Sequence, residues 1–213
     1  ARHKPHCQAW AGGYVLFSDL FTRNDTERIM IPDTFLPLTD LGPRICILGP
    51  SNSGKSTLAL AIAEKTDSPV VHLDQLFHQP GTRWQERPEA EFLALHESAV
   101  QQERWVMEGN YTRYLGSRLA RATGLIMLDI SMPVMLRRYF YRTLIQKDRA
   151  GNVLPAGLRD RLSKEMLKYL LVVTPGKRVQ NRTLYQHCSL PKVFLASPAQ
   201  TAACRQQWQL TKS

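Results

Sequence analysis

Residues 49–57 read Gly-Pro-Ser-Asn-Ser-Gly-Lys-Ser-Thr, which fits the P-loop pattern of a glycine, four unrestricted residues and then Gly-Lys-Ser. The apolar run at 45–48 predicts a buried strand before it, and the Ala- and Leu-rich residues 57–65 predict a helix after it. This arrangement points backbone N–H groups at phosphate oxygens. The stretch therefore predicts triphosphate binding, whereas an ordinary glycine turn with a surface lysine would leave the flanking strand and helix unexplained.

The motif also assigns roles to single residues. Lys55 carries a mobile positive charge for the β- and γ-phosphates, and the Ser56 hydroxyl is a candidate Mg²⁺ ligand. ATP and Mg²⁺ are the cofactors that these roles imply. The residues expected to bind the cofactor are Gly49, Ser51, Asn52, Ser53, Gly54, Lys55, Ser56 and Thr57.

Strand and helix patterns alternate over the rest of the chain, which predicts an α/β fold with a five-stranded parallel sheet flanked by helices. Residues 1–43 carry no motif and are expected to be an N-terminal extension, so the P-loop domain is expected to span 44–213. Further strands are predicted at 69–74, 104–108, 124–129 and 192–196, and helices from Pro88 and at 112–121, 133–146, 158–171, 176–187 and 199–208, with a polar loop at 75–87.

Carboxylates recur where the predicted strands end, and ligands of parallel sheets bind beyond those ends. Asp74 ends the strand expected to neighbour the first, and we predict that it orients or deprotonates an acceptor hydroxyl. Glu108 is expected to order a Mg²⁺-bound water or to contact the acceptor. The alternatives are a helix cap or loop carboxylate for Asp74, a tight turn through Gly109-Asn110 after Glu108, and a helix cap for Asp129.

The net charge is +10, and the basic surplus is concentrated between residues 137 and 182. Arg138 and Arg142 lie four residues apart on a predicted helix, so they share a face and are expected to reach one polyphosphate during catalysis. A lid is expected near 143–160, with Arg149 in it. Nucleic acid or a solvated helical face would also account for part of the surplus.

Four segments resemble adenylate-kinase-like P-loop proteins of the DNA topology modulation (FlaR-type) family: residues 47–58, 73–76, 105–111 with Glu-Gly-Asn-Tyr, and 126–129. The resemblance implies a nucleoside-monophosphate-kinase-like fold, ATP and Mg²⁺ binding, and a small acceptor that is poorly defined in the family. The chain departs from the family pattern where His78 follows Phe77 in place of a tryptophan, and where 146–151 lacks a compact Arg-Gly-Arg segment.

The leading hypothesis is an ATP-dependent small-molecule kinase that acts on a nucleotide or another hydroxyl or phosphate compound. The alternative is a nucleotide-dependent nucleic-acid-binding or regulatory ATP-binding protein, although the basic residues lack the interleaved aromatics of single-strand binders. No apolar run approaches the ~20 residues of a membrane span. The four cysteines are widely spaced without a C-x-x-C pair, which is typical of reduced thiols in a cytoplasmic protein.

Overall fold

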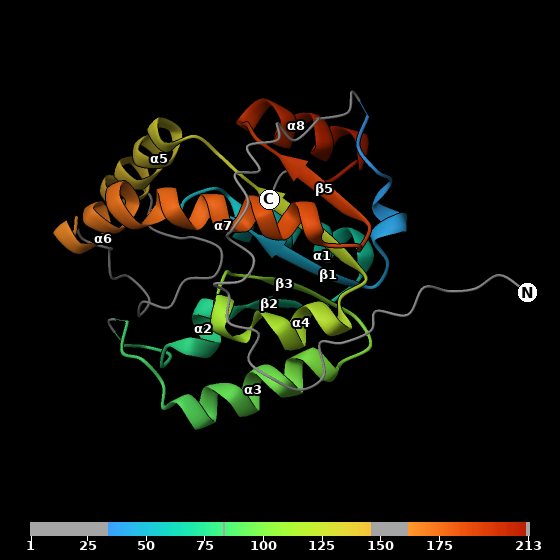
Figure 1. Cartoon of the computed structure of the whole chain (residues 1–213), viewed down its shortest axis with the longest axis horizontal. Helices are drawn as coiled ribbons and strands as arrows, with labels where there is room; N and C mark the ends of the chain where they lie inside the picture. The colour runs from blue at the N-terminus through green and yellow to red at the C-terminus, as the bar shows by residue number, and fades with distance from the viewer. Residues whose placement is uncertain (1–33, 83, 146–161, 212–213) are drawn as a thin grey trace, which may run out of the picture. The chain divides into compact units, whose positions relative to one another are not determined.

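A computed structural model describes residues 34–82, 84–145 and 162–211 of this chain. Its centre is a five-stranded sheet in the order β2-β3-β1-β4-β5, and every neighbouring pair is parallel (Figure 1). This confirms the predicted α/β fold. The strands are β1 (Arg44–Leu48), β2 (Val70–His72), β3 (Trp105–Glu108), β4 (Gly124–Leu128) and β5 (Lys192–Leu195).

The order of the strands corrects one expectation, because β3 and not β2 pairs with β1. All four residues of β3 are buried, whereas β2 is only three residues long and half-buried at its first two positions. The more apolar strand therefore takes the inner place and β2 forms the edge. Because β2 directly follows β1 in the chain, the sequence suggested β2 as the neighbour of β1.

The two faces of the sheet follow from the two-residue period of a strand. Ile45 and Ile47 point to the face covered by α1 (Lys55–Thr66) and α8 (Pro198–Gln207), where they pack with Leu58, Ile62 and Cys204. Val106 belongs to the same cluster, so Glu108, two residues further along β3, also points toward α1. The end of β3 thus faces the first turn of the P-loop helix.

The opposite face is covered by α3 (Glu89–Gln101), α4 (Leu115–Arg121) and α7 (Thr174–His187). Trp105 of β3 donates from its indole N–H to the Val100 carbonyl at 3.3 Å, and the ring of Tyr185 in α7 lies 5.1 Å from that of Phe194 in β5. Helices on both faces explain why the strands read as continuous apolar runs rather than as alternating ones.

The second strand ends earlier than predicted. β2 stops at His72, and Asp74 lies in the first turn of a short helix, α2 (Leu73–Phe77), that occupies the start of the predicted 75–87 loop. A bridge between His78 and Glu86 closes the rest of that loop. Asp74 is therefore carried by a helix beyond the sheet rather than by a strand end.

The helices predicted at 158–171 and 176–187 form one continuous run over their described part. α6 (Lys164–Lys168) continues through a π-helical turn, Tyr169–Val173, into α7. Pro175 explains the wide turn, because proline has no N–H to donate and its ring would collide with the carbonyl four residues earlier. The Tyr169 carbonyl accepts from the Thr174 N–H across this turn, and it also accepts from the Thr174 hydroxyl at 3.1 Å.

The remaining helices are close to their predicted positions. The predicted helix 112–121 begins with a 3₁₀ turn, Thr112–Tyr114, before α4, and the helix after Ser131 is α5 (Met132–Leu144). None of the helices in the described ranges is long and apolar enough to cross a membrane.

Residues before the P-loop strand also join the core. Phe35 and Leu41, the latter in a 3₁₀ turn (Leu38–Leu41), are buried in the cluster on the α1 face. The indole N–H of Trp208 donates to the Leu36 carbonyl at 2.9 Å. The boundary at residue 44 stays a prediction, but Phe35 is the first core residue within the part of the chain that the structure describes.

Candidate active site

The P-loop is built into the sheet by its first glycine. Gly49 has φ +148°, and a Cβ added there would lie 2.4 Å from the Leu128 carbonyl oxygen at the end of β4. Only glycine, which has no Cβ, can lie this close to that carbonyl oxygen. The Gly49 N–H donates to the side-chain oxygen of Asn110 at 3.0 Å, so the loop is tied to the segment that follows β3.

Two cations lie on the loop. The Lys55 ammonium donates to the Pro50 carbonyl at 3.0 Å, and a guanidinium N–H of Arg138 in α5 donates to the Ser53 carbonyl at 2.5 Å. Burial, and secondarily the neighbouring charge of Arg137, lowers the pKa of Arg138 below its ordinary value. The structure therefore places Arg138 at the loop, while catalytic roles for Arg138 and for Arg142, one turn further along α5, stay predictions.

Glu108 meets the P-loop helix directly. Its Oε1 accepts a hydrogen bond from the Ser56 hydroxyl at 2.9 Å and lies 2.9 Å from Nδ1 of His72. Burial would raise the pKa of the Glu108 carboxyl, but the bond to His72, the charge of Lys55 and the Ser56 hydroxyl outweigh it and lower the pKa below its ordinary value. Because the carboxyl is therefore ionised at neutral pH, His72 must be the donor in its contact with Glu108.

These oxygen atoms suit Mg²⁺. A hydroxyl and a carboxylate are the ligand types that this ion takes, and it usually completes its shell with phosphate oxygens and water rather than with protein groups. The described residues contain no cluster of three or more His, Cys, Asp or Glu side chains able to hold a metal alone. The donor set at Ser56 and Glu108 thus fits a magnesium ion that arrives with a nucleotide.

A fully buried arginine, which sequence reasoning missed, shapes the segment after β3. Arg118 of α4 donates to the carbonyls of Gly109 at 2.8 Å and Tyr111 at 3.2 Å, and also to that of Asn110. Gly109 and Tyr111 have φ +131° and +34°, and three bonds from one guanidinium stabilise this unusual path. The turn that was the alternative explanation for Gly109-Asn110 exists, and it positions the Asn110 side chain against the P-loop.

The segment after β3 also contacts Asp74, through Tyr111. The Tyr111 hydroxyl donates to Oδ1 of Asp74 at 2.7 Å. Burial, and after it the charge of Asp74 and this hydrogen bond, raise the pKa of Tyr111. The Tyr111 ring lies 5.0 Å from that of Phe77 and 5.8 Å from that of Phe92. Asp74 is exposed, so one of its oxygen atoms is oriented by the protein while the carboxylate remains open to a ligand.

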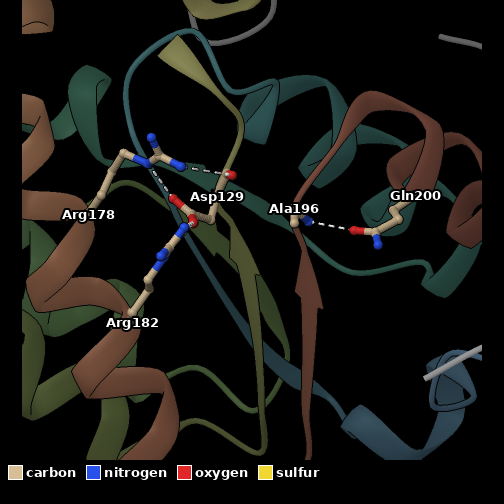
Figure 2. Close-up of polar contacts among 5 residues, drawn as sticks. All are labelled: Asp129, Arg178, Arg182, Ala196 and Gln200. Carbon is tan, nitrogen blue, oxygen red and sulfur yellow. Dashed lines mark hydrogen bonds and ion pairs between the residues drawn. The ribbon is translucent and has the colours of Figure 1, made fainter. Parts of the chain in front are cut away.

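Asp129 has a different role from a helix cap. This buried carboxylate pairs with two arginines of α7, Arg178 at 2.5 Å and Arg182 at 2.5 Å (Figure 2). Figure 2 also shows that the loop after the neighbouring strand β5 is closed by a bond from the Ala196 N–H to the Gln200 side chain at 2.7 Å. The i, i+4 spacing of the two arginines was visible in the sequence, but their partner was not.

The predicted site residues thus fall into three groups. The cofactor-binding residues lie on the loop and the first turn of α1, Glu108 is bonded to Ser56, and Asp74 is linked to the loop through residues 110 and 111. His72 is a further residue of the site that sequence reasoning overlooked, because the strand pattern accounted for it as one more strand position. Arg149 and the rest of the predicted lid beyond residue 145 lie outside the described residues.

Comparisons with known proteins give one distant structural likeness. No family model matches the chain, and no curated protein matches it. It is similar to the solved structure of a gluconokinase from Sinorhizobium meliloti 1021, with 16% sequence identity over 79% of this chain and 91% of that chain and a TM-score of 0.43. A likeness this distant transfers no substrate, and the FlaR-type resemblance stays an expectation.

Proposed function

We propose that this chain is an ATP-dependent kinase that transfers the γ-phosphoryl group to a small acceptor. The bond between Ser56 and Glu108 carries the proposal, since it places a buried, ionised carboxylate beside the hydroxyl of a P-loop. A phosphate cradle alone would serve any nucleotide-binding protein. A carboxylate at this point is what hydrolysis or phosphoryl transfer additionally requires.

The donor side is assigned to the loop and its two cations. Backbone N–H groups of residues 51–57 would hold the phosphates, with Lys55 and Arg138 supplying positive charge where negative charge develops on the transferring group. Mg²⁺, held by Ser56 and by water ordered on Glu108, would neutralise phosphate charge when bound. The lowered pKa of Glu108 supports this assignment, because a protonated carboxyl could not order a cation-bound water.

The acceptor side is assigned to Asp74. The acceptor oxygen would form a bond to the γ-phosphorus while the bond from that phosphorus to the bridging oxygen of ADP breaks, and a proton leaving an acceptor hydroxyl would pass to Asp74. The hydrogen bond from Tyr111 supports this role, since it orients the carboxylate without neutralising it. Lys55, Asp74, Glu108, Arg138 and Arg142 are the catalytic residues proposed here.

The charge distribution favours an enzyme over a nucleic-acid-binding module. Several arginines of the basic region already have partners inside the protein: Arg138 on the P-loop, and Arg178 and Arg182 on Asp129. Fewer cations of that region are therefore available for a phosphate backbone than the net charge suggests. A DNA affinity that falls steeply with salt would restore the alternative.

The proposal predicts that Lys55→Ala lowers kcat/KM for Mg²⁺- and acceptor-dependent ADP release roughly 100- to 1000-fold, because an anion-stabilising group is removed from the reacting phosphates. Release of ADP would be measured with nucleosides, nucleoside monophosphates, sugars and sugar acids as acceptors. Lys65→Ala, at the other end of α1, is the matched control and should behave like the parent protein. If no acceptor accelerates ADP release, the proposal is wrong.

A further inference from the structure

His72 lies at a place that strand pairing determines. It is the last residue of β2, and in the parallel register it is the direct partner of Glu108. Paired residues of neighbouring strands point to the same face, so both side chains face α1, where Ser56 lies in the first turn of the helix. His72 is only 6% exposed although β2 is an edge strand, so it is enclosed together with Glu108.

The two hydrogen bonds to Glu108 converge on one oxygen atom. The Ser56 hydroxyl and Nδ1 of His72 both lie 2.9 Å from Oε1, and they come from different elements. A glutamate side chain has three rotatable bonds. With a hydrogen bond from Ser56 alone, the carboxylate could still rotate about Oε1 and move Oε2. The second donor removes this freedom and fixes the plane of the carboxylate.

Among the described residues Asp129 is the second buried carboxylate, and comparison with it shows what is specific about the surroundings of Glu108. Asp129 is paired with two guanidinium groups, which neutralise it. Glu108 instead receives its hydrogen bonds from a hydroxyl and an imidazole, so its carboxylate is oriented without two guanidinium groups bonded to it. A purely structural carboxylate would be expected to have the partners of Asp129.

A second buried histidine shows that burial alone does not explain the pairing. His96 of α3 is 2% exposed, yet its Nε2 has no hydrogen-bond partner and it packs against the rings of Phe92 and Tyr114. The fold thus tolerates a buried imidazole nitrogen without a hydrogen-bond partner. The bond from His72 to Glu108 is therefore a property of the site rather than a general requirement of the core.

We propose that His72 is a positioning residue of the nucleotide site: its Nδ1–H orients Glu108 beside Ser56 and thereby sets how strongly Mg²⁺ promotes ATP binding and turnover. The inference rests on the proposed function, because it assumes that Glu108 acts on the magnesium–ATP complex. It adds a residue from the edge strand to a site otherwise made by the P-loop, β3 and α5. Residues that orient a ligand's immediate partners commonly change metal affinity or activity by ~10- to 100-fold when replaced.

The test uses the full chain with His72→Leu, which removes the donor, and His72→Asn, whose side-chain amide nitrogen can occupy nearly the position of Nδ1. His96→Leu, the second buried histidine, is the control for a general loss of packing. ATP affinity would be measured by calorimetry as Mg²⁺ is varied. We expect His72→Leu to raise the Mg²⁺ concentration for half-maximal ATP binding about 10-fold or more, and His72→Asn and His96→Leu to stay within about 3-fold of the parent protein.

Two further readouts separate positioning from stability. Nitrogen NMR of the parent protein at neutral pH should show His72 protonated on Nδ1, and replacement of Glu108 by Leu should abolish that preference. Where an acceptor is found, His72→Leu should lower kcat at fixed Mg²⁺ while the KM for the acceptor changes little. A His72→Leu protein with the parent's Mg²⁺ response, or an Nδ1 without a proton, overturns the inference.

The outcomes distinguish the two proposals. If the parent protein binds ATP in a Mg²⁺-dependent way but transfers no phosphoryl group, the proposed reaction is wrong and the binding experiment still decides the role of His72. If transfer occurs and all three variants show the same Mg²⁺ response as the parent protein, only the inference about His72 is wrong. If the parent protein binds no ATP, both are wrong.

Discussion

At the scale of single residues, the site depends on how each buried charged or polar group is paired. Glu108 is held by Ser56 and His72, and Arg118 is held by the carbonyls of residues 109–111. Each group that is buried without a partner costs about 1–3 kcal/mol, so these pairings are requirements of folding as well as of function. His96, which is buried without a hydrogen bond at Nε2, is one of the described residues where this requirement is not met.

His96 should therefore make the stability of the protein depend on pH. Burial, with a further contribution from the charge of Arg118, lowers the pKa of His96 from 6.5 to about 4. Between these pH values His96 is protonated in the unfolded chain but not in the folded chain. The free energy of unfolding should therefore fall as pH falls from 6.5 to about 4. Urea unfolding at several pH values would measure this decline.

His96→Leu is the variant that checks the assignment, since leucine cannot titrate and fills a similar apolar space. Its unfolding free energy should depend less on pH than that of the parent protein over the same interval. An equally steep decline in both proteins would mean that another group is responsible.

At the scale of elements, α7 is anchored to the sheet by its arginines. Arg178 and Arg182 lie one turn apart and both reach Asp129, immediately after β4 (Figure 2). The π-helical turn before α7, and Pro175 in its first turn, set the rotation of the helix about its axis. The element boundaries of α6 and α7 were therefore less predictable than the helical character of the region.

Asp129→Asn should loosen α7 in particular. An amide cannot form two ion pairs, and two guanidinium groups would then face each other beside a neutral group, so we expect a loss of about 1–3 kcal/mol of unfolding free energy. Hydrogen exchange should increase first in α7. The matched control is Asp67→Asn, an exposed residue with φ +48° where asparagine is equally acceptable, and it should leave both measurements unchanged.

At the scale of the whole described domain, the core joins segments that are far apart in the sequence. Phe35 and Leu41 pack on the same face of the sheet as Cys204 and Trp208. The Gln207 side chain accepts from the Phe35 N–H at 3.0 Å and donates to its carbonyl at 2.6 Å. The P-loop strand is thus enclosed by residues from both ends of the described chain, and the stability of the site depends on both.

Trp208→Ala should therefore destabilise the domain as a unit, by about 3–5 kcal/mol, because it removes a large buried ring and the hydrogen bond to Leu36. Thermal and urea unfolding would be followed by circular dichroism. Leu93→Ala removes an apolar side chain that is 40% exposed, and it should cost much less. If the two variants lose the same stability, Trp208 does not belong to the common core.

Much of this arrangement was contained in local patterns. The P-loop with its strand and helix, the parallel sheet and the carboxylate at the end of β3 followed from residue order, because strand period, apolar runs and glycine spacing act over a few neighbouring residues. Lys55, Ser56 and Glu108 were singled out in this way, and their roles stay predictions. Asp74 was singled out too, but it was predicted at the end of a strand and lies instead in a short helix, α2.

The contacts between elements were beyond those patterns. These contacts are the exchange of β2 and β3, the pairing of His72 with Glu108, the enclosure of Arg118 and the ion pairs of Asp129. They join residues from 7 positions apart, for Arg118 and Tyr111, to 61 positions apart, for Ile47 and Glu108. Such contacts depend on which apolar faces pack together and on which buried charges then find partners. A local pattern supplies the groups at the edge of the sheet, but packing determines which of them meet.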